Sequence, residues 1–350
     1  MVSITGAELT SAQRVMRVLA RQEPDRVPHF EWLIAANVRQ ALCPGCKDHN
    51  DFAVRMGHDA ILVGPDFTKQ QVAPTRYRTE WGYVLDYGGE EHGVEVESPI
   101  ASAEDLARYS PPDPHAPGRY ASIERAVAQY KGKFAIGVHL NDVFSIPRYL
   151  MGMEGLLMAI AAEPKLVAAL VNLSVEANVA MAKEVAARGA DFIWTGDDYA
   201  GNAGPFMSPR HFRELFAPGL ARVAAGFAAA GLPFVKHCDG NIHPIIDMMV
   251  DAGISALDPI DPQGGMDLAA VKARYGGRVA LKGNVDCTKV LVYDTEKHVV
   301  EATKAALRAG APGGGYILSS SNSIHSSICP ANYLTMMQTL RQFGRYPIAL

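Results

Sequence analysis

The sequence predicts an α/β fold of the (β/α)8 TIM barrel class, and two observations carry this prediction. Short, mostly apolar runs of three to seven residues alternate with longer amphipathic stretches, and eight strand-then-helix units follow one another. Runs this short and this apolar are typical of strands that are buried on both faces of a parallel sheet. A barrel needs about 250 residues, so one domain over 1–350 leaves room for an N-terminal helical extension, about 1–26, and a small insertion after the second strand. An open doubly wound sheet is the alternative fold.

The expected elements follow in chain order. The N-terminal helix is Thr10–Gln22, and the insertion lies between 65 and 131, where Tyr77–Gly88 has the pattern of a small hairpin. Ser208-Pro209 is typical of a helix start. Glycines stand where later helices are expected to end, at Gly231, Gly253, Gly276 and Gly310. The expected strands are Val27–Leu33, Ala60–Val63, Phe134–His139, Asp191–Trp194, Pro233–Lys236, Ser255–Leu257, Val279–Lys282 and Tyr316–Leu318, and the later helices are Pro209–Ala230, Ile242–Ala252, Leu268–Tyr275 and Glu296–Ala309.

Composition excludes several classes of protein. The chain has 33 Lys+Arg against 37 Asp+Glu, for a net charge of −4, so it has no bulk attraction to nucleic acid or to an anionic membrane. The most apolar long stretch, Leu156–Leu173, is interrupted by Glu163-Pro164-Lys165, so we expect no membrane-spanning segment. The first residues have no pattern of a secretory signal. With five cysteines, too few for a disulfide scaffold, we expect a reduced, cytoplasmic protein. The oligomeric state stays open, a homodimer being one option.

Polar residues lie in or just after every expected strand, at the end where barrel enzymes build their active sites. Each alone means little, because any soluble barrel has polar strand ends. A histidine and several carboxylates that converge on one rim are typical of a metal site or of acid–base chemistry. In chain order these residues are Glu31, Asp66, Asn141, Asp142, Asp197, Asp198, Tyr199, His237, Asp239, Asp258, Asp261, Asn284, Asp286, Ser320, Asn322 and His325.

His237 is the most informative of these residues. It has three open interpretations: a rim histidine that bonds to a neighbouring strand end, a ligand of a divalent metal, or a general acid or base. Alternate residues at a strand end face the same side. His237 and Asp239 are therefore expected to point together, and Cys238 to point away as a packing residue.

For the other candidate residues, both a structural and a functional interpretation remain open. Asp198 is either a ligand with Asp197 as its hydrogen-bonding neighbour or part of a loop turn. Glu214 lies on the following helix, where a solvated face or a salt bridge is the alternative to a role in the site. His325 is either a ligand contact or an ordinary loop residue. The single pair Cys43 and Cys46 is interpreted as a turn, with a redox or metal role as the alternative.

Several longer segments together resemble one known family. They are QRVMRVLARQEPDRVPHF, TEWGYVLDY, TGDDYAGNAGPFMSPRHFRELFAP, VKHCDGNIHPIIDMMVDAGISALDPI, LKGNVD and GGGYILSSSNSIHSSICPANYLTMM. The chain resembles the uroporphyrinogen decarboxylase superfamily, and within it the corrinoid-dependent methyltransferases. The arginine-rich substrate loop of the decarboxylases has no counterpart in VPHFEWLIAANVRQ, where Arg39 is the arginine present.

The resemblance implies a zinc ion at the barrel mouth. Members that methylate thiols hold it through His-x-Cys and a distant Cys. Here Asp239 stands at the first Cys position, and Ser320, Ser321 and Asn322 stand near the second. Both thiolates are missing, which argues against a thiol acceptor. Relatives that act on methyl ethers use carboxylates and a His, which on this chain implies Asp198, Glu214, His237 and Asp239 as metal ligands.

The implied function is that of the methyltransferase component of an O-demethylase. A methyl group would pass from a small methoxylated donor, expected to be an aryl methyl ether, to the cob(I)alamin of a partner corrinoid protein, with a zinc-type Lewis acid on the ether oxygen. His237, Asp198 and Asp239 are the expected catalytic residues, and Glu31, Trp81, Asn141, Tyr199, Asn284 and His325 the expected substrate contacts. Trp81, Tyr83 and Tyr199 either line an aromatic pocket or pack in the core. The alternative function is a metal-free decarboxylase or lyase that acts on a carboxylated substrate, and a corrinoid-binding module finds no support.

Overall fold

The computed structural model describes residues 8–88 and 93–350. They divide into two compact units, one formed by the described residues within Met1–Leu62, Ala128–Gly137 and Ser255–Leu350, and the other by those within Val63–Val127 and Val138–Ile254. Seven parallel strands have the order β1-β6-β7-β10-β11-β12-β13, which is their order along the chain. This is the pattern of successive βα units, so the expected α/β class is confirmed. The single domain over 1–350 stays a prediction.

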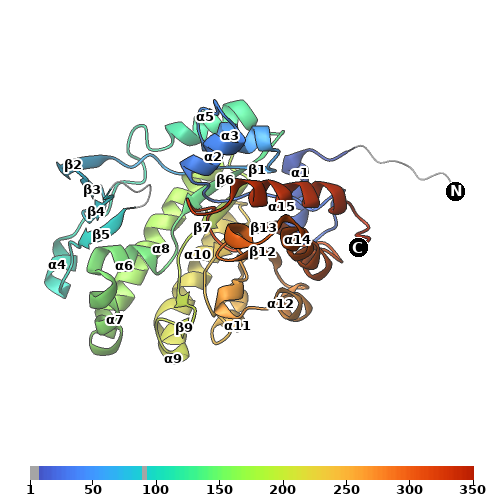
Figure 1. Ribbon diagram of the computed structural model, residues 1–350. Coiled ribbons are helices and arrows are strands. Elements are labelled where there is room, and N and C mark those ends of the chain that lie inside the picture. The colour runs from blue at the N-terminus through green and yellow to red at the C-terminus, as the bar shows by residue number, and fades with distance from the viewer. Residues whose placement is uncertain (1–7, 89–92) are drawn as a thin grey trace. The chain divides into compact units, whose positions relative to one another are not determined.

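The first unit contains the N-terminal helices and the last three βα steps of the chain. β11, β12 and β13 pair in parallel, with Leu281 opposite both Leu257 and Tyr316. Figure 1 shows α14 and α15 beside β12 and β13. The elements are α1 (Ser11–Leu19), α2 (Ala36–Leu42), α3 (His49–Met56), β11 (Ala256–Asp258), the 3-10 turn η2 (Pro262–Gly264), α12 (Leu268–Tyr275), β12 (Ala280–Val285), α13 (Val290–Tyr293), α14 (Glu296–Gly310), β13 (Tyr316–Ser320) and α15 (Pro330–Phe343).

The first expected strand, Val27–Leu33, is not a strand. It makes isolated parallel bridges, His29 with Leu318 and Ile34 with Ile324. Pro28 has no N–H to give to a ladder, and the N–H of His29 donates to the Asp59 carboxylate at 2.9 Å instead of to a strand. The segment therefore lies along β13 in extended form without a continuous set of backbone bonds.

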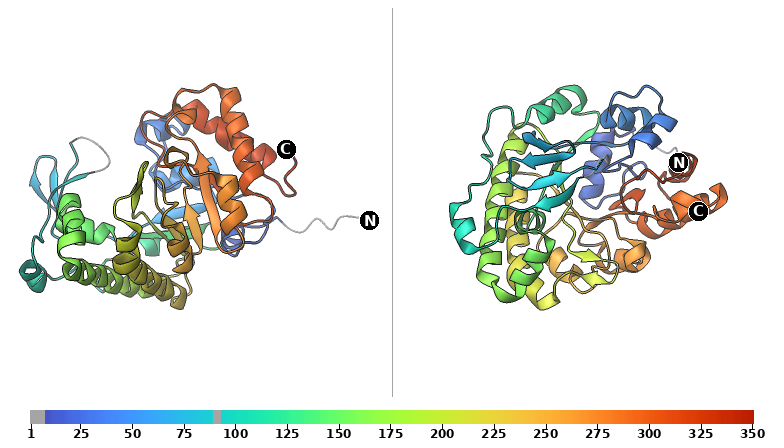
Figure 2. Two further views of the ribbon diagram at one scale, coloured as in Figure 1. Left: turned by 90° about the horizontal axis from the view of Figure 1, so that it is seen from below. Right: turned by 60° about the vertical axis from the view of Figure 1, so that its left-hand side comes forward.

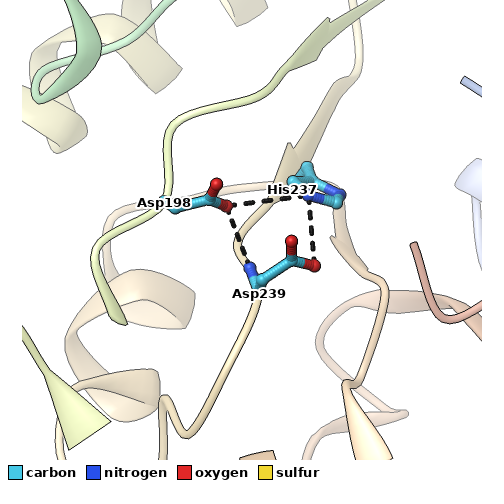
Figure 3. Close-up of side chains that lie close together, drawn as sticks. All are labelled: Asp198, His237 and Asp239. Atoms are coloured by element: carbon cyan, nitrogen blue, oxygen red, sulfur yellow. Dashed lines mark hydrogen bonds and ion pairs between the residues drawn. The ribbon is translucent and has the colours of Figure 1, made fainter. Parts of the chain in front are cut away.

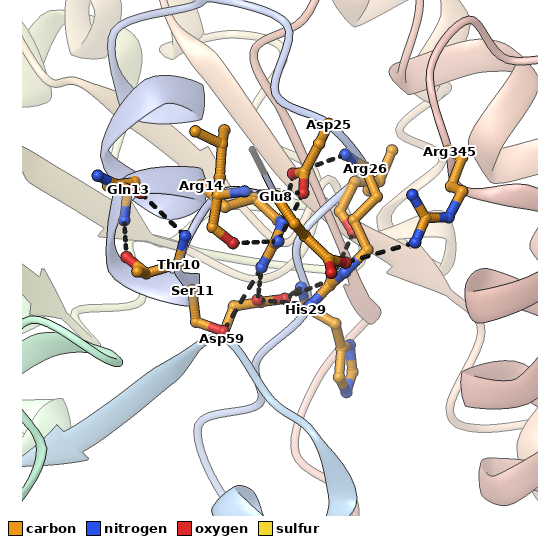
Figure 4. Close-up of polar contacts among 12 residues, drawn as sticks. Glu8, Thr10, Ser11, Gln13, Arg14, Asp25, Arg26, His29, Asp59 and Arg345 are labelled. Atoms are coloured by element: carbon orange, nitrogen blue, oxygen red, sulfur yellow. Dashed lines mark hydrogen bonds and ion pairs between the residues drawn. The ribbon is translucent and has the colours of Figure 1, made fainter. Parts of the chain in front are cut away.

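A network of buried charges ties the N-terminal helix to this segment (Figure 4). The Arg14 guanidinium pairs with Asp25 at 2.7 Å and with Asp59 at 2.7 Å, and Arg26 pairs with the other Asp59 oxygen at 2.8 Å. α1 itself begins with a capping box between Thr10 and Gln13. The expected N-terminal helix is confirmed, and these contacts fix it in place.

The second unit contains the long helices α8 and α10 and an antiparallel sheet. β7 and β10 pair in parallel, with Lys236 opposite Thr195. The expected hairpin is part of a larger sheet of order β2-β3-β4-β5, drawn in blue to cyan in Figure 2. The elements are β2 (Lys69–Ala73), β3 (Arg76–Thr79), β4 (Val84–Asp86), β5 (Val94–Glu97), α4 (Ala103–Arg108), α6 (Ser145–Met151), α7 (Met153–Ala162), α8 (Pro164–Ala187), β7 (Phe192–Thr195), β8 (Ala200–Gly201), β9 (Gly204–Pro205), α9 (Pro209–His211), the π-helical turn η1 (Phe212–Phe216), α10 (Ala217–Ala229), β10 (Phe234–His237) and α11 (Ile246–Asp251). β1 (Ala60–Val63), α5 (Ala121–Tyr130) and β6 (Ala135–Leu140) have residues in both units.

The helix expected over 209–230 is divided into α9, η1 and α10. The cause is Pro218, which has no N–H to donate one turn back, so the preceding turn widens to π geometry. α10 lies tightly against α8. A Cβ at Gly226 would lie 2.5 Å from Val179 Cγ2, so only glycine permits this approach.

α8 is long and apolar enough to cross a membrane by length and composition alone, with a mean hydropathy of 1.3 over its best window. Half of that window is buried inside the structure, where α8 packs against α6, α7 and α10. The buried apolar residues of α8 therefore pack in the interior of this unit.

Candidate metal centre and adjoining pocket

Two neighbouring parallel strands of the second unit place the candidate site. β7 ends at Thr195 and β10 ends at His237, and the register sets Lys236 beside Thr195. The residues that follow both strands therefore leave the sheet at the same edge. Asp198 comes from the loop after β7, and His237 and Asp239 come from the end of β10 (Figure 3).

The three side chains converge. His237 Nε2 lies 3.6 Å from Asp198 Oδ1 and 3.3 Å from Asp239 Oδ1. The backbone N–H of Asp239 donates to Asp198 Oδ1 at 3.1 Å, which joins the two loops directly. One donor atom from each residue lies within 4.8 Å of the other two. The Asp198 side chain is 44% exposed and that of His237 12%, so the cluster opens to solvent on the Asp198 side.

The donor set fits a divalent cation. One imidazole nitrogen and two carboxylate oxygens suit zinc or a slightly harder ion, and three protein ligands leave a position for substrate. Burial raises the pKa of Asp198, as does the neighbouring Asp239 carboxylate, while His237 lowers it. Such a crowded pair of carboxylates favours a bound cation, because a cation offsets the repulsion between them.

Cys238 points away from the cluster, as the two-residue period predicts. Its side chain is buried, and its sulfur accepts a hydrogen bond from the N–H of Tyr199 at 3.1 Å. Burial raises the pKa of the thiol far above its usual range. Cys238 is therefore a protonated packing residue and not a thiolate ligand.

A cavity of about 250 Å³ adjoins the cluster within the same unit. Its walls are mostly aromatic and aliphatic. Tyr83 stacks on Tyr149 with ring centroids 4.6 Å apart, and Phe67 lies against Trp81 at 6.1 Å. The lining residues are Gly64, Pro65, Phe67, Lys69, Thr79, Trp81, Tyr83, Leu85, His139, Leu140, Asn141, Tyr149 and Met181. The volume and the flat ring surfaces suit one small aromatic ring.

The indole of Trp194 connects the cavity to the cluster. Its ring centroid is 5.1 Å from that of His139, which lines the cavity, and 5.1 Å from that of His237. Gly196 makes room for this arrangement, since a Cβ there would lie 2.9 Å from Trp194 Cη2. Burial lowers the pKa of His139 to about 4, with a smaller contribution from His237 in the same direction, so the imidazole facing the cavity is neutral at pH 7.

Two expected site residues of this unit lie elsewhere. Glu214 is on the π-helical turn with its side chain 54% exposed, 3.9 Å from Arg210, and it is not a member of the cluster around His237. Tyr199 is fully buried and does not line the cavity. Its hydroxyl donates to Asp142 beneath the loop. Trp81 and Asn141, by contrast, line the cavity.

The other three expected substrate contacts belong to the first unit. Glu31 is buried and accepts from the N–H and the hydroxyl of Ser320, each at 2.8 Å. Asn284 donates to the Ile260 carbonyl at 3.0 Å. His325 Nε2 lies 3.0 Å from the Cys287 carbonyl.

The pair Cys43 and Cys46 forms a disulfide in a short turn after α2, so the expectation of a fully reduced chain is wrong at this point. Its Cα atoms are 5.7 Å apart, within the range that a disulfide requires. Cys238, Cys287 and Cys329 are not in disulfides. A loop closed over three residues constrains the unfolded chain little, so this bond contributes little stability.

Comparisons with known proteins agree with this architecture. A family profile named uroporphyrinogen decarboxylase matches residues 79–343. A uroporphyrinogen decarboxylase of Psychromonas ingrahamii is 22% identical over 258 residues, 70% of either chain. One of Aromatoleum aromaticum is 24% identical over 276 residues, 74% of this chain and 73% of the relative. A solved methyltransferase from Methanosarcina mazei is 18% identical, with a TM-score of 0.74 over 96% of this chain and 99% of that one, a likeness in fold.

Proposed function

Because the chain belongs to the uroporphyrinogen decarboxylase family, we propose that it is the methyltransferase component of an O-demethylase. It takes a methyl group from an aryl methyl ether and delivers it to cob(I)alamin carried by a partner corrinoid protein, in the cytoplasm. The observation that supports this best is the metal-type cluster of Asp198, His237 and Asp239 joined through Trp194 to an aromatic cavity.

The ether carbon–oxygen bond is hard to break because the leaving oxygen takes both bonding electrons as phenoxide. A divalent cation held by Asp198, His237 and Asp239 would supply Lewis-acid stabilisation for that oxygen, worth several kcal/mol. The chain has no thiolate in the cluster, and oxygen and nitrogen ligands favour a donor that binds through oxygen. The departing phenoxide gains a proton on release.

The cavity residues bind and orient the donor. The rings of Trp81, Tyr83 and Tyr149 offer faces for one aromatic ring, and the Asn141 amide offers a hydrogen bond to a polar substituent. The neutral His139 adds no charge to this wall. The ring of Trp194 contacts both His139, which lines the cavity, and His237 of the cluster.

The alternative is a metal-free decarboxylase, which the names of the curated relatives favour. A tetrapyrrole with several carboxylates needs several cations and a larger space. The cavity has Lys69 among its lining residues and no arginine. A carboxylated substrate would leave its charges unpaired there, so we prefer the ether donor.

The test is a panel of methyl donors with free cob(I)alamin as acceptor, with methylcobalamin followed by absorbance. We expect turnover with a methoxylated arene, stoichiometric zinc in the purified protein, and loss of both with His237→Ala. The control is His298→Ala, an exposed histidine paired with Asp294 at 3.3 Å. A fully active metal-free protein would support the decarboxylase alternative. No methylcobalamin from any donor, with or without the partner protein, would refute the proposal.

A further inference from the structure

Lys236 occupies an unusual position directly beneath the candidate metal centre. It is the last but one residue of β10, and its side chain is fully buried. A buried ammonium is costly unless each of its three N–H groups has an acceptor. Its surroundings therefore show what the lysine holds.

Three oxygens from three segments surround the ammonium. Lys236 Nζ donates to the Asp197 carbonyl at 2.5 Å and to the His237 carbonyl at 2.7 Å, and it pairs with Asp142 Oδ2 at 3.0 Å. Asp197 directly precedes Asp198, and His237 is itself in the cluster. The three donors of one side chain thus connect both segments that supply the candidate ligands.

The third acceptor extends this network towards the cavity. Asp142 follows Asn141, whose side chain lines the cavity, and its carboxylate also accepts from the hydroxyls of Thr195, at 2.6 Å, and Tyr199. Asp197 Oδ2 accepts from the N–H groups of Phe144 and Ser145 at 2.9 and 2.8 Å. The loops after β6, β7 and β10 therefore share one buried polar network.

At the far end of the loops the backbones touch. The N–H of Asn241 donates to the Gly201 carbonyl at 2.9 Å, and a Cβ on Gly240 would lie 2.4 Å from that same oxygen. The two loops are thus fixed at the base by Lys236 and at the tip by this contact. Asp198 and Asp239 lie between the two fixed points.

We propose that Lys236 is a positioning residue that sets the spacing of Asp198, His237 and Asp239 for a divalent cation. This inference rests on the proposed function, since it concerns the same metal centre. The lysine touches neither the cation nor the donor and acts through the backbone of the segments that carry the ligands. Neighbours that orient metal ligands typically change metal affinity 10–100-fold when they are removed.

The experiment measures metal binding directly. Apoprotein is titrated with Co²⁺ and followed by its visible absorption bands, and Zn²⁺ affinity is obtained by competition with a chromophoric chelator. The variants are Lys236→Met and the double variant Lys236→Met/Asp142→Asn. The double variant removes both charges of the Lys236–Asp142 pair, the carboxamide introduced at position 142 keeps an acceptor oxygen for the neighbouring hydroxyls, and the Asp197 carboxylate keeps its bonds from Phe144 and Ser145, so it is designed to fold. Circular dichroism and the thermal midpoint check the fold.

The matched control is Lys282→Met. Lys282 is buried like Lys236 and pairs with Asp258 at 2.9 Å, but it belongs to β12 in the other unit. We expect the folded double variant to bind Co²⁺ about 10–100-fold more weakly with changed absorption bands, and Lys282→Met to keep the wild-type constant within about twofold.

The outcomes separate the two claims. A folded double variant with wild-type affinity and bands overturns the role of Lys236 and leaves the proposed function standing. Equal weakening in Lys282→Met also overturns it, because the effect would then follow from general destabilisation. A wild-type protein that binds neither ion overturns the metal centre itself, and with it the proposed function.

Discussion

Lys236 and Lys282 are two buried lysines in equivalent settings, each on a parallel strand and each paired with an aspartate, at 3.0 Å to Asp142 and 2.9 Å to Asp258. They differ in what else they hold. Both ammonium groups lie over an aromatic ring, Lys236 at 3.9 Å from the ring centroid of Tyr199 and Lys282 at 5.3 Å from that of Phe30. Lys236 in addition donates to two backbone carbonyls at the strand ends. A buried ion pair is weak proof of stability or function by itself. The hydrogen bonds that the ammonium makes besides the ion pair therefore indicate which segments the lysine holds together.

The largest effect is expected when the carboxylate partner of either lysine is removed. Asp142→Ala and Asp258→Ala each leave a buried ammonium without its main counter-charge, so each should lower the free energy of unfolding by about 3–5 kcal/mol. Urea denaturation at pH 7 measures the loss. We expect Co²⁺ affinity to fall in folded Asp142→Ala and to stay unchanged in folded Asp258→Ala. An equal fall in both would show that the two pairs do not differ in kind.

A pH series sharpens the description of the Lys282 region. Burial raises the pKa of Glu31 to about 7, although Lys282 lowers it. The folded state therefore binds more protons than the unfolded state between pH 4.5 and about 7, and stability is lost as the pH rises through this window. In Glu31→Gln, the fall in the free energy of unfolding between acidic and neutral pH should be smaller by about 3 kcal/mol. Urea melts from acidic to neutral pH test this, with the exposed Glu154→Gln as control. A wild-type curve parallel to that of Glu31→Gln would contradict it.

A smaller effect on stability and metal binding is expected from a substitution at the loop tips, where the two backbones are in contact. Gly240 has φ +77° and faces the Gly201 carbonyl. Gly240→Ala should therefore lower the free energy of unfolding by about 1–3 kcal/mol and weaken Co²⁺ binding. Gly231 has φ +79° with open space around it, so Gly231→Ala should cost about 1 kcal/mol and leave the metal affinity unchanged. Thermal melts and Co²⁺ titrations compare the two. Unchanged affinity in Gly240→Ala would mean that the tip contact does not set the ligand spacing.

The smallest effect is expected at Tyr199. Tyr199→Phe removes the hydroxyl that donates to Asp142, and the buried carboxylate keeps its bonds to Thr195 and Lys236, so the loss should be about 1 kcal/mol. Because Tyr199 does not line the cavity, KM for the methyl donor should not change, whereas Trp81→Ala should raise it. Steady-state kinetics of the two variants decide this. A raised KM in Tyr199→Phe would place the ring in contact with the donor.

The strand positions were predictable because their apolar runs are short and bounded. The period of two also predicted that His237 and Asp239 point together, and their side chains lie 3.3 Å apart. For Tyr199, the sequence left a pocket wall and core packing open, and the structure buries the ring away from the cavity. The strand expected over 27–33 failed because Pro28 and the side chain of Asp59 replace ladder bonds.

The contacts of Lys236 and Trp194 could not be predicted from the sequence. Each stands inside an apolar strand segment, where it is one unremarked polar or aromatic residue. Their contacts depend on Asp142 and His139, which follow or end another strand far along the chain. Close approach at Gly196 and Gly240 leaves no room for a Cβ, and both glycines lie within two residues of a candidate ligand.

The indole of Trp194 contacts both His139, which lines the cavity, and the candidate metal ligand His237. A smaller residue at position 194 would make room beside His139 but would also remove the ring contact of His237. Under the proposed function, acceptance of larger methyl donors at this position would therefore weaken cation binding. Divergence towards bulkier donors, in nature or in directed evolution, should therefore proceed through the opposite side, where Trp81, Tyr83 and Tyr149 can shrink without touching the cation ligands.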